Sequence, residues 1–189
     1  MHAETFVHIE LHGPADEVRG FVEGFRLAVG ESRVYSAVRE NVKIDGFFGS
    51  LLARAGHSVH YLVPEGLVGP LKEAIGATEV VEIELENSRA IRHAELEFNF
   101  RCFSAEEGEA IRNVIENDLP EGVVLEGYTV DKRIDADAKG TELYSPVHDF
   151  DMTGHGRFHG PVDGIIEIGR RLNDQDFIHP DRIRLVYSD

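Results

Sequence analysis

A five-residue pattern, His-Gly-Pro-x-Asp, occurs twice in the 189-residue chain, at residues 12–16 and 159–163. Each copy follows a run of alternating apolar and polar residues, which is typical of a strand, and precedes apolar residues at helical spacing. Proline suits the first position of a helix, because its missing N–H needs no partner there, and aspartate favours the positive end of the helix dipole. Both copies therefore predict a corner where a strand turns into a helix, with proline as the first helical residue.

The predicted elements follow the same order in both halves of the chain. In the first half we expect strands at about 4–12, 32–38, 57–63 and 78–85, and helices at 14–30, 67–75 and 45–56. In the second half we expect strands at about 95–102, 123–134, 147–158 and 182–187, and helices beginning near 104 and 161. Without the extra helix at 45–56, each half has the order β-α-β-β-α-β. The sequence therefore predicts an α+β protein of two tandem ferredoxin-like units, 1–88 and 89–189, with antiparallel sheets and helices on one face.

The composition excludes several classes of function. The formal net charge is −16, and neither half has the clustered Lys and Arg that a phosphate backbone requires, so we expect no nucleic-acid partner. We also expect no membrane span, because the sequence has no long apolar run, and no signal peptide, because the first residues lead directly into a strand. The single cysteine, Cys102, excludes an internal disulfide. It is expected to point inward from its strand together with Leu96, Phe98 and Phe100, which alternate with polar residues. These features predict a cytoplasmic protein.

The first candidate site is His8-x-Glu10-x-His12 in the first predicted strand. Alternate residues of a strand face the same side, so these three side chains share a face, which we expect to be turned away from the core. Imidazole nitrogens and carboxylate oxygens bind Zn²⁺, so the pattern predicts a divalent metal site, with zinc as the example. The alternative is a solvated sheet face that binds nothing.

The second candidate site is the polar face of the strand predicted at 147–158, together with the corner that follows it. The candidate ligand-binding residues alternate along this face: Asp149, Asp151, His155, Arg157 and His159. In a ferredoxin-like unit the helices cover one face of the sheet, so a polar face marks the open side. It predicts binding of a small ligand, with a metal ion or water alone as alternatives. On the opposite face, Gly154 and Gly156 predict a bulge or the close approach of a helix.

Three functions remain open. We expect a protein that binds a small ligand or a divalent metal on its open sheet faces and forms a homodimer. The second is a metal-dependent hydrolase or lyase, in which the first candidate site holds the ion and His155 or His159 is the general base. The third is a structural or assembly subunit without a site. No sequence motif decides whether the protein is an enzyme, and the catalytic residues are unknown.

Overall fold

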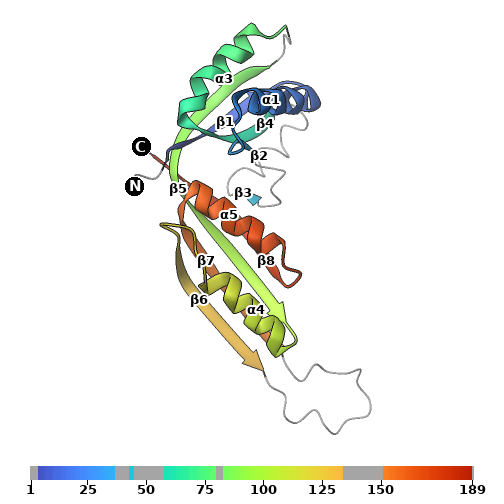
Figure 1. Ribbon diagram of the computed structural model, residues 1–189, viewed down its shortest axis with the longest axis vertical. Coiled ribbons are helices and arrows are strands. Elements are labelled where there is room, and N and C mark those ends of the chain that lie inside the picture. Colours follow the sequence, from blue (N-terminus) through green and yellow to red (C-terminus); the bar gives the residue numbers. More distant parts are fainter. Residues whose placement is uncertain (1–3, 37–42, 45–57, 80–82, 134–150, 189) are drawn as a thin grey trace. The chain divides into compact units, whose positions relative to one another are not determined.

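The structure is a computed structural model that describes residues 4–36, 43–44, 58–79, 83–133 and 151–188 (Figure 1). Within these residues the protein is α+β, with four helices and antiparallel strand pairs. The elements are β1 (Phe6–His12), α1 (Ala15–Val29), β2 (Tyr35–Ser36), β3 (Lys43–Ile44), β4 (Ser58–Pro64), α3 (Glu65–Ala77), β5 (Glu84–Cys102), α4 (Ala105–Glu116), β6 (Val124–Arg133), β7 (Asp151–Pro161), α5 (Val162–Asn173) and β8 (Ile178–Tyr187). The extra helix predicted at 45–56 lies outside the described residues. None of the described helices is both long and apolar enough to cross a membrane.

The chain divides into two compact units. Unit 1 comprises Met1–Ala94, Pro161–Asp163 and Ile183–Asp189, and unit 2 comprises Glu95–Gly160 and Gly164–Arg182. The strand order is β2-β4-β1-β5-β7-β6, and β8 pairs with β5 and β3.

Strand β5 contributes to both units as one strand of 19 residues. The sequence analysis instead predicted separate strands at 78–85 and 95–102. Residues 84–102 contain no glycine or proline, so nothing in the local chemistry breaks the strand between them. The predicted division at residues 88 and 89 therefore lies inside β5.

The core of unit 1 lies between its two helices and one face of its strands. Val7, Ile9 and Leu11 alternate along β1 and face the helices, as their spacing predicts. Their register partners on β4 and the buried helical residues complete the same cluster: Val59, Tyr61, Val63, Val18, Val22 and Leu71. Because α1 and α3 both contribute to this cluster, they cover the same face of β1 and β4.

The core of unit 2 is built on the alternating residues of β5 that the sequence predicts to point inward. All are buried, with no more than 3% of each side chain exposed: Leu96, Phe98, Phe100 and Cys102. Phe98 stacks on Phe158 of β7, with ring centroids 5.0 Å apart. Helix α4 packs here through Gly108, where a Cβ atom would lie 2.7 Å from Cε of Met152.

Gly154 and Gly156 of β7 face the aromatic rings of β5. A Cβ atom at position 154 would lie 2.4 Å from Cζ of Phe100, and one at position 156 would lie 2.8 Å from Cζ of Phe98. The element that approaches these two glycines closely is therefore strand β5, through its phenyl rings, and not the predicted helix.

The two His-Gly-Pro-x-Asp patterns do form corners between a strand and a helix. Pro14 is the N-cap of α1, which begins at Ala15, and Pro161 ends β7 before α5 begins at Val162. The prediction that proline is the first helical residue is wrong by one position at both corners. The C-terminus of α1 is as predicted, because Gly30 takes the left-handed conformation (φ 68°) that favours glycine.

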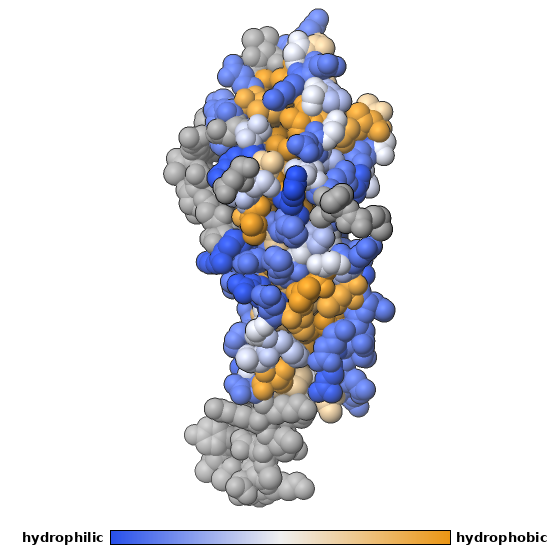
Figure 2. All heavy atoms as spheres, turned by 90° about the vertical axis from the view of Figure 1, so that its left-hand side faces the viewer, coloured by the Kyte–Doolittle hydropathy of each residue, from blue (hydrophilic) through white to orange (hydrophobic). Residues whose placement is uncertain are grey.

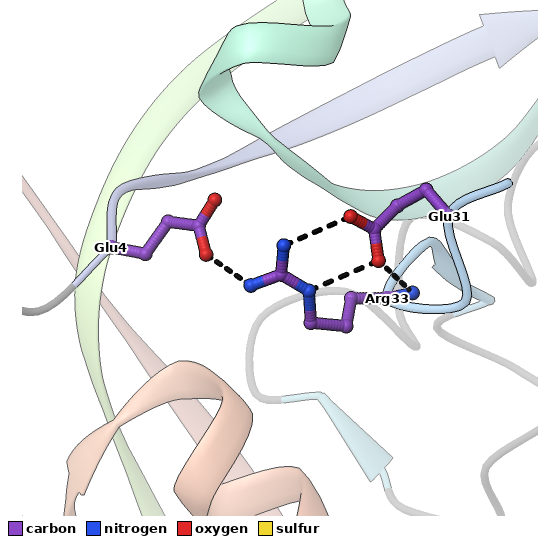
Figure 3. Close-up of polar contacts among 3 residues, drawn as sticks. All are labelled: Glu4, Glu31 and Arg33. Atoms are coloured by element: carbon purple, nitrogen blue, oxygen red, sulfur yellow. Dashed lines mark hydrogen bonds and ion pairs between the residues drawn. The ribbon is translucent and has the colours of Figure 1, made fainter. Parts of the chain in front are cut away.

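A charged network joins the start of β1 to the connection between α1 and β2 (Figure 3). The Arg33 guanidinium donates to both carboxylate oxygens of Glu31, over 3.0 and 2.9 Å, and also to Glu4. Hydrogen bonds from the Arg33 side chain and backbone lower the pKa of Glu31 to about 2.

Candidate functional site

The outer face of β7 in unit 2 is polar, as the sequence predicts. Thr153 and His155 are exposed, whereas Met152 and Phe158, which point the other way, are buried. Strand β6 brings its own polar residues to this face, because Glu126 lies opposite Arg157 and Thr129 lies opposite His155. The register shifts between these two pairs, so a bulge separates them.

A surface pocket of about 450 Å³ lies on this face of unit 2. It is lined by residues of four strands: Glu97, Phe98, Asn99, Glu126, Gly127, His155, Gly156, Arg157 and Asp181. The pocket thus brings together two of the predicted ligand-binding residues, His155 and Arg157. Glycine at position 127 fits the bulge, since its backbone has a positive φ of 59°.

Arg157 is held at the pocket by two carboxylates. Its Nη2 atom lies 3.1 Å from Oε2 of Glu126, and its Nη1 atom lies 3.5 Å from Oε2 of Glu95. The Arg157 side chain is 39% exposed, so these pairs contribute little to stability, but they orient the guanidinium. Beside it, the Thr129 hydroxyl lies 3.1 Å from the ring nitrogens of His155.

The side chains that line the pocket carry more negative than positive charge. Glu97, Glu126 and Asp181 are carboxylates, and Arg157 is the one guanidinium among the lining residues. Local sequence spacing does not identify these three carboxylates as site residues, because they lie outside the sequence of β7. The alternation along β5 does place Glu97 on the outer face, so this one carboxylate could have been predicted from the sequence.

The other predicted ligand-binding residues are not among those that line the pocket. Asp149 lies outside the described residues, and of Asp151 the structure describes only the backbone, at the start of β7 opposite Arg133. His159 lies opposite Val124 near the corner and is half-buried. Ligand binding by these three residues stays a prediction.

In unit 1, His8 is turned away from the helices as expected, but it is not exposed to solvent. Its exposed fraction is only 6% on the face of β1 opposite the helices. The same face also carries Phe6, Tyr35 and Leu62, all buried, and Phe6 stacks on Tyr35. Buried apolar side chains of three strands therefore share this face with His8, and the polar residues at positions 8, 10 and 12 do not by themselves make it open.

His8 and His12 do not converge. Residues four apart in a strand are separated by about 13 Å, and His12 instead lies beside Glu86, with Nδ1 3.4 Å from Oε1. The histidine that meets His8 is His60 of β4, which the sequence analysis did not consider. Their ring centroids are 5.6 Å apart, and His60 is 1% exposed.

Neighbours on other strands determine the electrostatics of His8. Its Nδ1 atom lies 3.0 Å from the Tyr187 hydroxyl, and the Arg89 guanidinium lies 3.7 Å above the Tyr187 ring. Burial, followed by the nearby His60, lowers the pKa of His8 to about 4, so the ring is neutral at neutral pH. As the side chains stand, no three His, Cys, Asp or Glu residues in the described ranges are arranged to hold a metal ion.

Comparisons with known proteins do not indicate a function for this chain. No protein-family model matches the sequence, and no curated protein matches it. One solved structure, described as "Crystal Structure of an Unknown Protein from Galdieria sulphuraria", is 14% identical to this chain. The similarity covers 98% of this chain and 99% of that one, but the TM-score is 0.27, so we base no argument on it.

Proposed function

We propose that unit 2 binds a small, positively charged organic molecule in the pocket on the outer face of β5, β6 and β7. The observation that carries this proposal is the pocket itself, whose volume of about 450 Å³ falls in the range of small-molecule sites. Its charged side chains come from strands that pair with one another, and a small number of placed polar groups is how such sites fix the orientation of a ligand.

The charges favour a cation over an anion. Arg157 already contacts Glu95 and Glu126, so an anionic ligand would have to compete with two carboxylates for it. An ammonium group would instead be attracted by Glu97 and Asp181. The net charge of −16 adds a long-range attraction for cations, which is weakened by salt. His155 also lines the pocket and offers a ring nitrogen to a polar group of the ligand.

Calorimetric titration with amines and with carboxylates of matched size tests this proposal. We expect a diamine such as putrescine to bind and the dicarboxylate of similar length, adipate, not to bind. Glu97→Gln and Asp181→Asn should weaken diamine binding, while Glu109→Gln, on the exposed surface of α4, should not. Tighter binding of the dicarboxylate, or equal weakening by Glu109→Gln, would show that the pocket does not select cations.

We further propose that each unit is a ferredoxin-like β-α-β-β-α-β arrangement, with β5 as the last strand of unit 1 and the first of unit 2. The strand order supports this, because in each unit the fourth strand pairs with the first, and the first with the third. A cytoplasmic location and a metal-dependent hydrolase or lyase activity stay proposals from the sequence alone.

A homodimer formed through a sheet edge also stays a proposal. Strand β6 ends the strand order, and Val124 and Val130 on it are exposed. Figure 2 shows one face of the protein, where hydrophobic residues reach the surface between hydrophilic ones. Sedimentation of the wild-type chain and of Val130→Lys tests it, since a dimer that uses this edge should dissociate in the variant.

A further inference from the structure

Two buried histidines lie side by side in the sheet of unit 1, on the face turned away from its helices. His8 is on β1 and His60 is on β4, with ring centroids 5.6 Å apart. Only 6% of His8 and 1% of His60 is exposed. Tyr35 of β2 and Leu62 of β4 share this face and are buried as well. A proton on either ring would therefore place a positive charge away from water, which costs free energy unless an opposite charge compensates for it.

Most of the titratable and charged groups around the pair do not compensate for such a charge. Arg89 of β5 is a cation and the register partner of His8. Its guanidinium lies 3.7 Å above the ring of Tyr187, whose hydroxyl lies 3.0 Å from Nδ1 of His8. Burial raises the pKa of Tyr187, so this side chain is neutral at and below neutral pH. Glu10 acts in the opposite sense, because its Oε1 atom lies 3.9 Å from Nε2 of His60 and its negative charge favours a protonated ring.

Burial outweighs the carboxylate at His8. Burial, followed by the nearby His60, lowers the pKa of His8 from 6.5 to about 4, although Glu10 raises it. In the unfolded chain the same ring takes up a proton near pH 6.5. The unfolded chain therefore binds this proton more tightly than the folded protein does, and proton uptake favours unfolding. The resulting destabilisation begins as the pH falls through 6.5 and is complete below about pH 4.

We propose that the His8–His60 pair is a pH-sensitive switch in unit 1. At neutral pH both rings are neutral and this face of the sheet is closed to water. Acidification favours a state in which the face has opened and the two rings are charged and hydrated. No metal-binding group includes these side chains among the described residues, so the proposal concerns protons alone. It does not depend on the ligand proposed for unit 2.

Urea unfolding of the full chain at pH 7 and at pH 5 tests the proposal by comparing the wild type with His8→Gln, which cannot take up this proton. From pH 7 to pH 5, the unfolding equilibrium constant of the wild type should rise about 20-fold more than that of the variant. His60→Gln should also reduce the dependence on pH. His12→Gln is the matched control on the same strand, since the His12 side chain is 42% exposed, and it should not reduce the dependence.

A second measurement covers the case in which His8→Gln fails to fold. In ¹⁵N spectra of the histidine rings of the folded wild type, the His8 ring should still be neutral at pH 5. A His8 ring that titrates near pH 6.5 in the folded protein would overturn the proposal. The same holds if the wild type and folded His8→Gln lose stability equally between pH 7 and pH 5, or if His12→Gln removes the dependence on pH.

Discussion

Alanine at position 156 tests whether the glycines of β7 are required by the rings of β5. The new Cβ atom would lie 2.8 and 3.0 Å from two carbons of the Phe98 ring, closer than such atoms normally approach. Overpacking of this kind costs about 1–3 kcal/mol, so we expect Gly156→Ala to lower the free energy of unfolding by that amount. Urea unfolding followed by circular dichroism at pH 7.5 measures it.

A second substitution separates this clash from other effects. All the atoms that the alanine at 156 would meet belong to side chains, so Phe98→Leu should recover part of the loss in the double variant. At position 154 the Cβ atom would also lie 2.7 Å from the backbone carbonyl oxygen of Thr129. Gly154→Ala should therefore cost more, and Phe100→Leu should recover little of that loss.

Gly20 of α1 is the control, because a Cβ atom there would meet nothing within 4 Å. Gly20→Ala should stabilise the protein by up to about 1 kcal/mol through helix propensity. If Gly156→Ala behaves like Gly20→Ala, or if Phe98→Leu brings no recovery, the packing of β5 against β7 described above is wrong.

Three further predictions concern single side chains. Cys102 is fully buried, so it should react with a thiol reagent only when the protein unfolds, and rapid labelling of the native protein would contradict its placement. Glu31 has its pKa lowered to about 2 by Arg33, so its contribution to stability is present above about pH 4.5 and is lost as the pH falls towards 2. The difference in unfolding free energy between wild type and Glu31→Gln should therefore be largest near pH 7 and vanish near pH 2; an equal difference at both values would refute the ion pair. Removal of the hydroxyl that contacts His8, in Tyr187→Phe, should lower the free energy of unfolding by about 1 kcal/mol, as measured by urea unfolding.

The sequence predicts well what depends on alternation within one strand. The inward positions of β5 and the polar outer face of β7 follow from a period of two residues, and both are confirmed. The burial of His8 was not predictable in this way, because it depends on side chains of other strands, such as His60 and Tyr187. A polar residue in an alternating strand indicates an open face only when the neighbouring strands are polar as well.

The composition of both candidate sites depends on the register between strands. His60 meets His8 because β4 pairs with β1 antiparallel, and Asp181 reaches the pocket because β8 pairs with β5. Neither relationship is visible in local spacing, so the sequence analysis selected residues adjacent in sequence, such as His12. The continuity of β5 was missed for a different reason, since an expected domain boundary was placed where no strand-breaking residue occurs.

Amide chemical shifts of the ¹⁵N-labelled full chain, recorded during a titration with putrescine, test the proposed function of unit 2 most directly. Binding in the pocket should produce saturable shifts that centre on Glu97, Glu126, His155 and Arg157, and adipate at the same concentrations should leave these signals unchanged. Shifts that do not saturate, or that spread over the acidic surface without a maximum at these residues, would contradict the existence of a cation-binding site there.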